Sequence, residues 1–167
     1  HPPVVVTNTQ RWTDVSKLIT TKAIEGVISS PGPGQPDRPE DFGVCMELLE
    51  HCKLPILGVC LGHQGIAHFH GARVRVAQEP RHGRLSRVTV LADDMPSVNQ
   101  AGGEAHATTK LFQGVHSPFS VVRYHSLVVE RTTLPSTLVP LAETEDGMLM
   151  GLRHTSLPHW GVQFHPV

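Results

Sequence analysis

Residues 55–59 (PILGV) form a continuous apolar run that leads directly into a cysteine flanked by glycines. Such a run is typical of a strand buried on both faces, as in a parallel sheet covered by helices. Further short apolar runs, at residues 3–7 and 24–30, alternate with helical stretches in the first half of the chain. This alternation predicts an α/β fold with a mostly parallel sheet flanked by helices.

A helix is predicted after the second of these runs. Asp37 is a candidate N-cap, Pro39 suits the first helical turn, and Glu40 stands at the capping-box position. Spacing then places four residues on one apolar face: Phe42, Cys45, Met46 and Leu49.

The pattern changes after Gly71. Residues 87–91 alternate between polar and apolar, which is typical of an antiparallel or half-exposed strand. Residues 93–107 are polar and contain glycines, which predicts a surface insertion. We expect later strands at residues 119–123, 148–153 and 160–164.

Composition excludes several classes of protein. The 167 residues carry 14 Lys and Arg against 15 Asp and Glu, and this balance argues against binding to nucleic acid or to an anionic membrane. No apolar run approaches the roughly 20 residues of a membrane span. The 39% content of hydrophobic residues suits one folded domain over residues 1–167. The three cysteines match no disulfide framework, which favours a reducing, intracellular setting.

Cys60 is the strongest candidate for a reactive group. It lies in the sequence Gly58-Val59-Cys60-Leu61-Gly62, the thiol counterpart of the Gly-x-Ser-x-Gly nucleophile elbow. Small flanking residues permit a sharp strand-to-helix turn, and the helix N-terminus favours a thiolate. The N–H of Leu61 could then donate to an oxyanion. The alternative is a buried structural cysteine beside packing glycines.

A thiolate nucleophile needs a proton carrier, and the sequence has 12 histidines. His165 is favoured because it follows the apolar residues 160–164, at the strand end where α/β sheets carry ligand sites. His63, His68 and His70 are predicted to be packing or surface residues, and no metal site is expected.

Residues 30–34 (SPGPG) form a rigid turn that could aim N–H groups at an anion, or could simply connect a strand to a helix.

Four segments together resemble the class I (triad) glutamine amidotransferases. They are residues 30–34 (SPGPG), 58–64 (GVCLGHQ), 123–127 (RYHSL) and 161–166 (GVQFHP). The first and third favour the branch that serves chorismate enzymes, which holds anthranilate synthase component II and the amidotransferase part of 4-amino-4-deoxychorismate synthase. Residues 79–86 and 149–154 favour the latter. The resemblance implies a flavodoxin-like α/β fold.

The resemblance also implies a role for each matching residue. Cys60 would attack glutamine and form a glutamyl thioester, with His165 as the proton carrier. Leu61 and the turn Gly32-Pro33-Gly34 would hold the oxyanion, and Gln64, Ser126 and Leu127 would hold the substrate. The ammonia would pass to a synthase domain or subunit that carries chorismate and Mg²⁺, so this domain would need no cofactor of its own.

Two departures from the family pattern lead us to expect an incomplete domain, part of a larger fused amidotransferase–synthase. The family has a Glu two positions beyond the catalytic His, where this chain has Val167. It also has a strand and a helix upstream of the strand predicted at residues 3–7.

The predicted function is ammonia supply for p-aminobenzoate and folate biosynthesis. The alternatives are anthranilate synthase component II in tryptophan biosynthesis, or a catalytically impaired remnant acting as a binding module. The expected compartment is the cytoplasm, or a plastid if the source is a plant.

Overall fold

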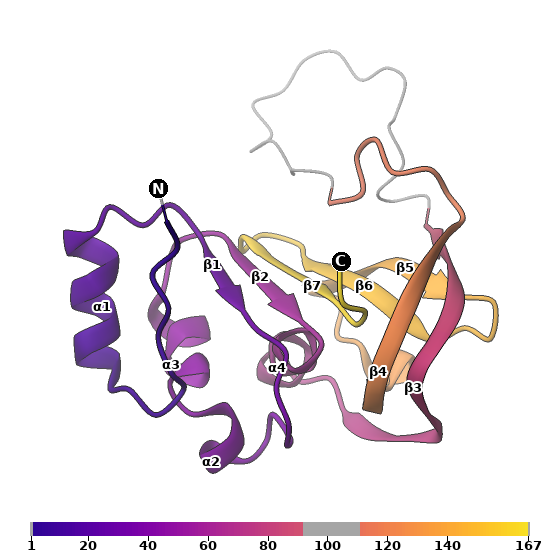
Figure 1. Ribbon diagram of the computed structural model, residues 1–167, viewed down its shortest axis with the longest axis horizontal. Coiled ribbons are helices and arrows are strands. Elements are labelled where there is room, and N and C mark those ends of the chain that lie inside the picture. Colours follow the sequence, from indigo (N-terminus) through magenta and orange to yellow (C-terminus); the bar gives the residue numbers. More distant parts are fainter. Residues whose placement is uncertain (1, 92–110, 167) are drawn as a thin grey trace.

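The computed structural model describes residues 2–91 and 111–166 (Figure 1). In this part of the chain a seven-stranded sheet has the order β1-β2-β7-β6-β5-β3-β4. The strands are β1 (Val27–Ser29), β2 (Ile56–Val59), β3 (Val74–Val90), β4 (Phe119–Val129), β5 (Leu138–Thr144), β6 (Leu149–His154) and β7 (His159–Val162). The helices are α1 (Trp12–Thr21), α2 (Pro39–Phe42), α3 (Val44–His51) and α4 (Leu61–Phe69), with a 3₁₀ turn, η2, at Arg131–Thr133.

The sheet has a parallel and an antiparallel half. β1, β2 and β7 pair in parallel, whereas the remaining neighbours among the described strands pair antiparallel. The α/β class is confirmed, but the sheet is mixed rather than mostly parallel. The physical reason is the connections: β5, β6 and β7 follow one another through links of a few residues, too short for the crossover that parallel neighbours need.

Most predicted strands are present with adjusted ends. The runs at residues 24–30, 55–59, 119–123, 148–153 and 160–164 correspond to β1, β2, β4, β6 and β7, and residues 87–91 overlap the end of β3. β5 was not predicted. The predicted insertion at residues 93–107 lies outside the described residues.

The strand predicted at residues 3–7 is not formed. Residues 2–7 are exposed and have no strand assignment, and the Val5 side chain is 86% exposed. Pro2 and Pro3 have no N–H to give to a ladder, and the three valines that follow remain 37–86% exposed.

The helix predicted after Asp37 is divided in two at Gly43. Its N-cap is Arg38 rather than Asp37. Gly43 has φ +50°, and a Cβ there would lie 2.1 Å from the carbonyl oxygen of Asn8, which accepts the N–H of Val44 at 2.9 Å. The close approach of this distant segment interrupts the helix, although the predicted apolar face remains buried or half-buried.

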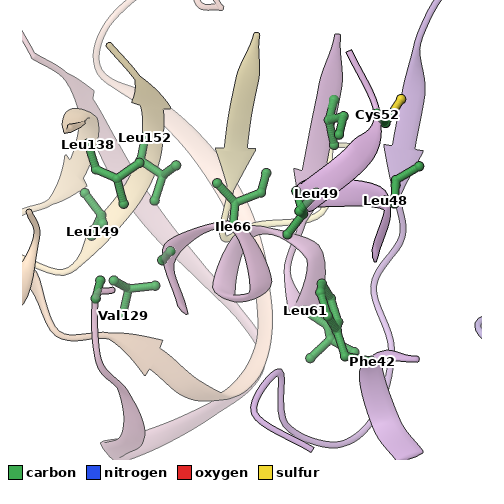
Figure 2. Close-up of a cluster of buried hydrophobic side chains, with 13 residues drawn as sticks. Phe42, Leu48, Leu49, Cys52, Leu61, Ile66, Val129, Leu138, Leu149 and Leu152 are labelled. Atoms are coloured by element: carbon green, nitrogen blue, oxygen red, sulfur yellow. The ribbon is translucent and has the colours of Figure 1, made fainter. Parts of the chain in front are cut away.

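Helix α4 is the centre of the core that supports the site. It packs on β1, β2 and β7, and α3 packs against it in turn. Ile66 of α4 is fully buried between apolar side chains of α3 and of the antiparallel strands (Figure 2).

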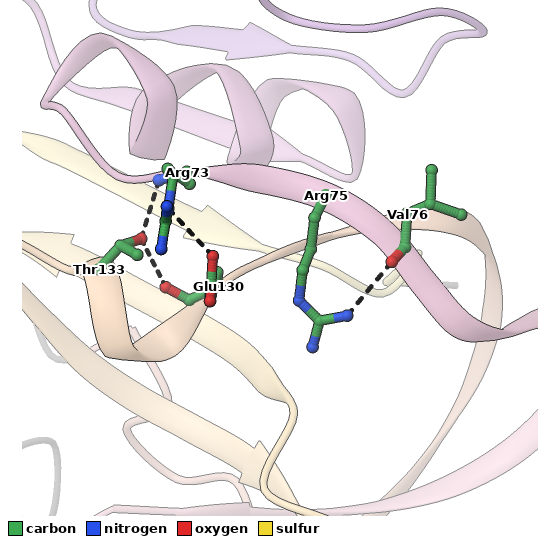
Figure 3. A network of polar contacts seen from close by, with 5 residues as sticks. All are labelled: Arg73, Arg75, Val76, Glu130 and Thr133. Carbon is green, nitrogen blue, oxygen red and sulfur yellow. Dashed lines mark hydrogen bonds and ion pairs between the residues drawn. The ribbon is translucent and has the colours of Figure 1, made fainter.

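Polar contacts join the start of β3 to the end of β4. Arg73 forms an ion pair with Glu130 at 3.1 Å, and its N–H donates to the hydroxyl of Thr133 (Figure 3). The two long strands are thereby tied together beside α4. None of the described helices is long and apolar enough to cross a membrane.

Candidate active site

Three of the predicted site segments meet at the carboxyl edge of the parallel strands. Ser29 of β1 aligns with Gly58 of β2, and Val59 aligns with Val162 of β7. The N–H of Cys60 donates to the carbonyl of Val162 at 2.9 Å. The loop after β1, Cys60 after β2 and the segment after β7 therefore leave the sheet side by side, where open α/β sheets bind ligands.

Cys60 occupies a strained turn between β2 and α4. Its φ of 52° and ψ of −99° lie in a region that side chains rarely adopt, at a cost of about 1–3 kcal/mol. The glycines on either side make the turn possible. A Cβ at position 58 would lie 2.4 Å from the Gly62 carbonyl, and one at position 62 would lie 2.2 Å from the Ser29 carbonyl oxygen. The strand–cysteine–helix arrangement is as predicted.

The sulfur of Cys60 contacts polar groups of β4 and of the segment after β7. The thiol donates to the carbonyl of Tyr124 at 3.8 Å, and the side-chain amide of Gln163 donates to the sulfur at 3.7 Å. Burial raises the pKa of the Cys60 thiol, although the Leu61 N–H and the Gln163 amide oppose this shift. This direction is opposite to the one expected from the helix N-terminus, because desolvation is the largest of these effects.

His165 lies half-buried beyond the end of β7. Its ring is 6.1 Å from the ring of Tyr124, measured between centroids, and its Nε2 is buried without a hydrogen-bond partner among the described residues. Tyr124 thus borders both predicted catalytic residues, since its carbonyl accepts from Cys60.

The loop containing Gly32, Pro33 and Gly34 lies beside the start of α4. A Cβ on Gly32 would lie 3.0 Å from the Leu61 side chain. Gly34 has φ +94° and leaves room for the carboxylate of Asp41, which accepts the N–H of Gln35 at 2.9 Å. Asp41 therefore positions this loop, a role that the sequence signalled only as an acidic residue in a first helical turn.

The predicted substrate residues come together from α4 and β4. Gln64 is 2% exposed, and its Nε2 donates to the carbonyl of Leu127 at 3.1 Å and to Oε1 of Gln163 at 3.2 Å. Leu127 is half-buried, whereas its neighbour Ser126 is exposed on β4. Gln163 and Tyr124 were missed as site residues although both stand inside the family-like segments.

Several other histidines among the described residues are buried or half-buried. His63 is fully buried, and burial lowers its pKa to about 3, so it packs as a neutral ring. His70, His154 and His159 form a separate cluster in which His70 and His159 share a hydrogen bond of 3.1 Å. Among the described residues, no group of three or more His, Cys, Asp or Glu is arranged to hold a metal ion.

Comparisons with known proteins agree on one family. The model described as glutamine amidotransferase class-I matches residues 2–166. Aminodeoxychorismate synthase from Streptomyces griseus is 54% identical over 144 residues, which are 86% of this chain and 17% of that protein. Anthranilate synthase component 2 from Methanothermobacter marburgensis is 43% identical over 143 residues, which are 85% of this chain and 64% of that protein. The chain therefore spans less than two thirds of either curated relative.

The fold is also similar to solved structures. A putative GMP synthase protein from Thermoplasma acidophilum superposes with a TM-score of 0.70 at 26% identity. The match covers 96% of this chain and 81% of that one.

Proposed function

The chain belongs to the class-I glutamine amidotransferases, and from this premise we propose that it releases ammonia from glutamine for the conversion of chorismate to 4-amino-4-deoxychorismate. The observation that carries the proposal is the strained elbow, in which Cys60 stands at the start of α4 with its N–H bonded to the carbonyl of Val162, three residues before His165. The choice of acceptor is supported by the 54% identity to an aminodeoxychorismate synthase.

The reaction begins with a proton transfer. Because burial raises the pKa of Cys60, the resting sulfur is a thiol, and His165 takes its proton as the sulfur attacks the amide carbon of glutamine. The carbonyl oxygen becomes an oxyanion held by the Leu61 N–H and by the backbone of the turn Gly32-Pro33-Gly34. The C–N bond then breaks, and His165 returns the proton to the leaving ammonia.

A second half-reaction restores the enzyme. Water attacks the thioester carbon while His165 takes a proton from it. The C–S bond breaks, glutamate leaves, and the sulfur regains a proton. Gln64, Ser126 and Leu127 would hold the amino-acid part of glutamine throughout. Both half-reactions use side chains and backbone alone. Chorismate and Mg²⁺ would bind in the synthase that receives the ammonia.

A second candidate function is that of anthranilate synthase component II. The observation in its favour is the 43% identity to such a protein, over 64% of that protein's length. The two functions share the chemistry at Cys60 and differ in the synthase that consumes the ammonia.

Labelling with a glutamine analogue that carries an electrophilic carbon tests the shared chemistry. We expect one mass adduct on Cys60 and none on Cys45 or Cys52, which serve as internal controls. Cys60→Ala should abolish the adduct and Cys45→Ala should not. Equal labelling of the three cysteines would refute the catalytic role of Cys60.

Reconstitution distinguishes the two acceptors. The chain is mixed with each chorismate-binding synthase, chorismate and amide-labelled glutamine, and the labelled product is identified by mass spectrometry. We expect 4-amino-4-deoxychorismate. Labelled anthranilate alone would assign the second function, and ammonia release with neither synthase responding would contradict both acceptors.

A further inference from the structure

Gln163 stands directly after β7 and is fully buried. Its N–H donates to the carbonyl of Met150 at 3.0 Å, which fixes its backbone against β6. Its side chain lies between two groups of the site, with Nε2 at 3.7 Å from the sulfur of Cys60 and Oε1 at 3.2 Å from Nε2 of Gln64.

The orientation of the Gln64 and Gln163 side-chain amides follows from the carbonyl of Leu127, with which their series of hydrogen bonds begins. The carbonyl oxygen of Leu127 can only accept, so the Gln64 atom at 3.1 Å from it must be the NH₂ group. That same NH₂ meets Gln163, so the Gln163 atom facing it must be the amide oxygen. The other end of the Gln163 amide, an NH₂ with two donors, therefore faces the sulfur.

Such a donor matters most when the sulfur is charged. A thiol can donate to the carbonyl of Tyr124, but a thiolate would face that carbonyl oxygen unfavourably. The Gln163 amide offers an N–H to the sulfur in either state, and its bond becomes charge-assisted once the proton has left. Because Cys60 is only 6% exposed, water does little to replace this donor.

We propose that Gln163 is a further catalytic residue, which donates a hydrogen bond to the Cys60 thiolate and so sets how readily the nucleophile forms. Gln64 is the positioning residue that keeps the Gln163 amide turned toward the sulfur. The proposal rests on Cys60 being the nucleophile of the proposed function.

The test measures the pH dependence of Cys60 alkylation by iodoacetamide in the whole chain. Mass spectrometry follows Cys60, Cys45 and Cys52 in the same sample across the titration range of a thiol. Gln163→Met keeps the length of the side chain and removes the donor. We expect the Cys60 midpoint to rise by about one pH unit, which slows alkylation about tenfold near neutral pH. Gln163→Glu, which turns a carboxylate toward the sulfur, should raise the midpoint further.

Two other variants separate the roles. Gln64→Met should raise the midpoint by less than Gln163→Met, because the donor is still present but is no longer oriented. Gln113→Met, on the exposed surface, should leave all three cysteines unchanged. A purely structural role of Gln163 would alter access to all three cysteines and would not move the midpoint of one.

An unchanged Cys60 midpoint in Gln163→Met would overturn the proposal, even if the glutamine analogue still labels Cys60. Unfolding of Gln163→Met would be seen as equally fast alkylation of the three cysteines. In that case an unchanged Cys60 midpoint in Gln163→Glu would overturn the proposal. Failure of the analogue to label wild-type Cys60 would instead refute the proposed function, and the alkylation midpoints would still report on Gln163.

Discussion

Gly62 lies where the first turn of α4 crosses the end of β1. A Cβ at this position would stand 2.2 Å from the carbonyl oxygen of Ser29 and 2.9 Å from its carbonyl carbon. Both atoms belong to the backbone of a sheet strand, so neither can rotate away. Gly62→Ala must therefore move the start of α4, together with Cys60, away from β1.

The expected loss follows from two opposing effects. Ordinary van der Waals contact begins at 3.4 Å, so the helix must retreat by about 1 Å. Alanine improves helix propensity by about 1 kcal/mol, whereas overpacking costs about 1–3 kcal/mol. A backbone contact belongs at the upper end of that range, so we expect a net loss of about 2 kcal/mol. A displacement of about 1 Å at the nucleophile should also slow its reaction about 100-fold.

Gly65 supplies the matched control on the same helix. A Cβ there would lie 2.0 Å from the tip of the Phe42 ring, which is a side chain and can be shortened. Gly65→Ala should therefore be largely rescued by Phe42→Leu. Ser29→Ala should not rescue Gly62→Ala, because the obstructing carbonyl remains.

Urea unfolding gives the free energies, and the rate of Cys60 labelling by the glutamine analogue gives the effect on the site. If Gly62→Ala unfolds at the wild-type urea concentration and labels at the wild-type rate, the elbow is not closed as tightly as the contact implies. Rescue of Gly62→Ala by Ser29→Ala would show that a side chain, not the carbonyl, is the obstacle.

Three further predictions concern strain, protonation and the proton carrier. Because Cys60 has φ 52°, Cys60→Gly should be more stable in urea than Cys60→Ala by about 1 kcal/mol or more, and equal stabilities would contradict the strain. Burial lowers the pKa of His70 and of His159 to about 4, below the unfolded value of 6.5. The free energy of unfolding should thus be greatest above about pH 6.5 and fall toward pH 4, by at most about 1.4 kcal/mol per pH unit for each histidine. A flat profile in urea titrations over that window would refute this. Val167→Glu should raise glutaminase turnover, measured as glutamate release, since the family pattern has a Glu there to orient His165; an unchanged rate would contradict that role.

Features of the fold that depend on neighbouring residues could be predicted from the sequence. The apolar run before Cys60 and the glycines around it led to β2, the elbow and α4, since each depends on residues only a few positions apart. The break at Gly43 could not be predicted, because it arises from a contact with Asn8 in another segment. The mixed sheet was missed for a similar reason: periodicity indicates a strand but not the direction of its neighbour.

The candidate site also contains residues that could be predicted from the sequence and residues that could not. Cys60, His165 and the turn at Gly32 were found as strand-end features, and the carboxyl edge of the parallel strands brings their segments together. Tyr124 and Gln163 were not found, because their contacts with the sulfur depend on how β4 and the segment after β7 approach Cys60. Only the folded arrangement shows which atom of each residue faces Cys60.

Burial raises the pKa of the Cys60 thiol, and the hydrogen bonds donated to the sulfur act against this shift. Enclosing the sulfur removes the water that would stabilise a thiolate, and this desolvation is the largest effect on the thiol pKa, ahead of the opposing Leu61 N–H and Gln163 amide. The same exclusion of water strengthens every donor that remains, among them the Leu61 N–H and the Gln163 amide. As the proposed nucleophile, the buried Cys60 would depend on fixed donors and on a base that takes the proton during the attack. The close packing at Gly58 and Gly62 fixes the turn that carries Cys60, and Gln64 holds the amide of Gln163.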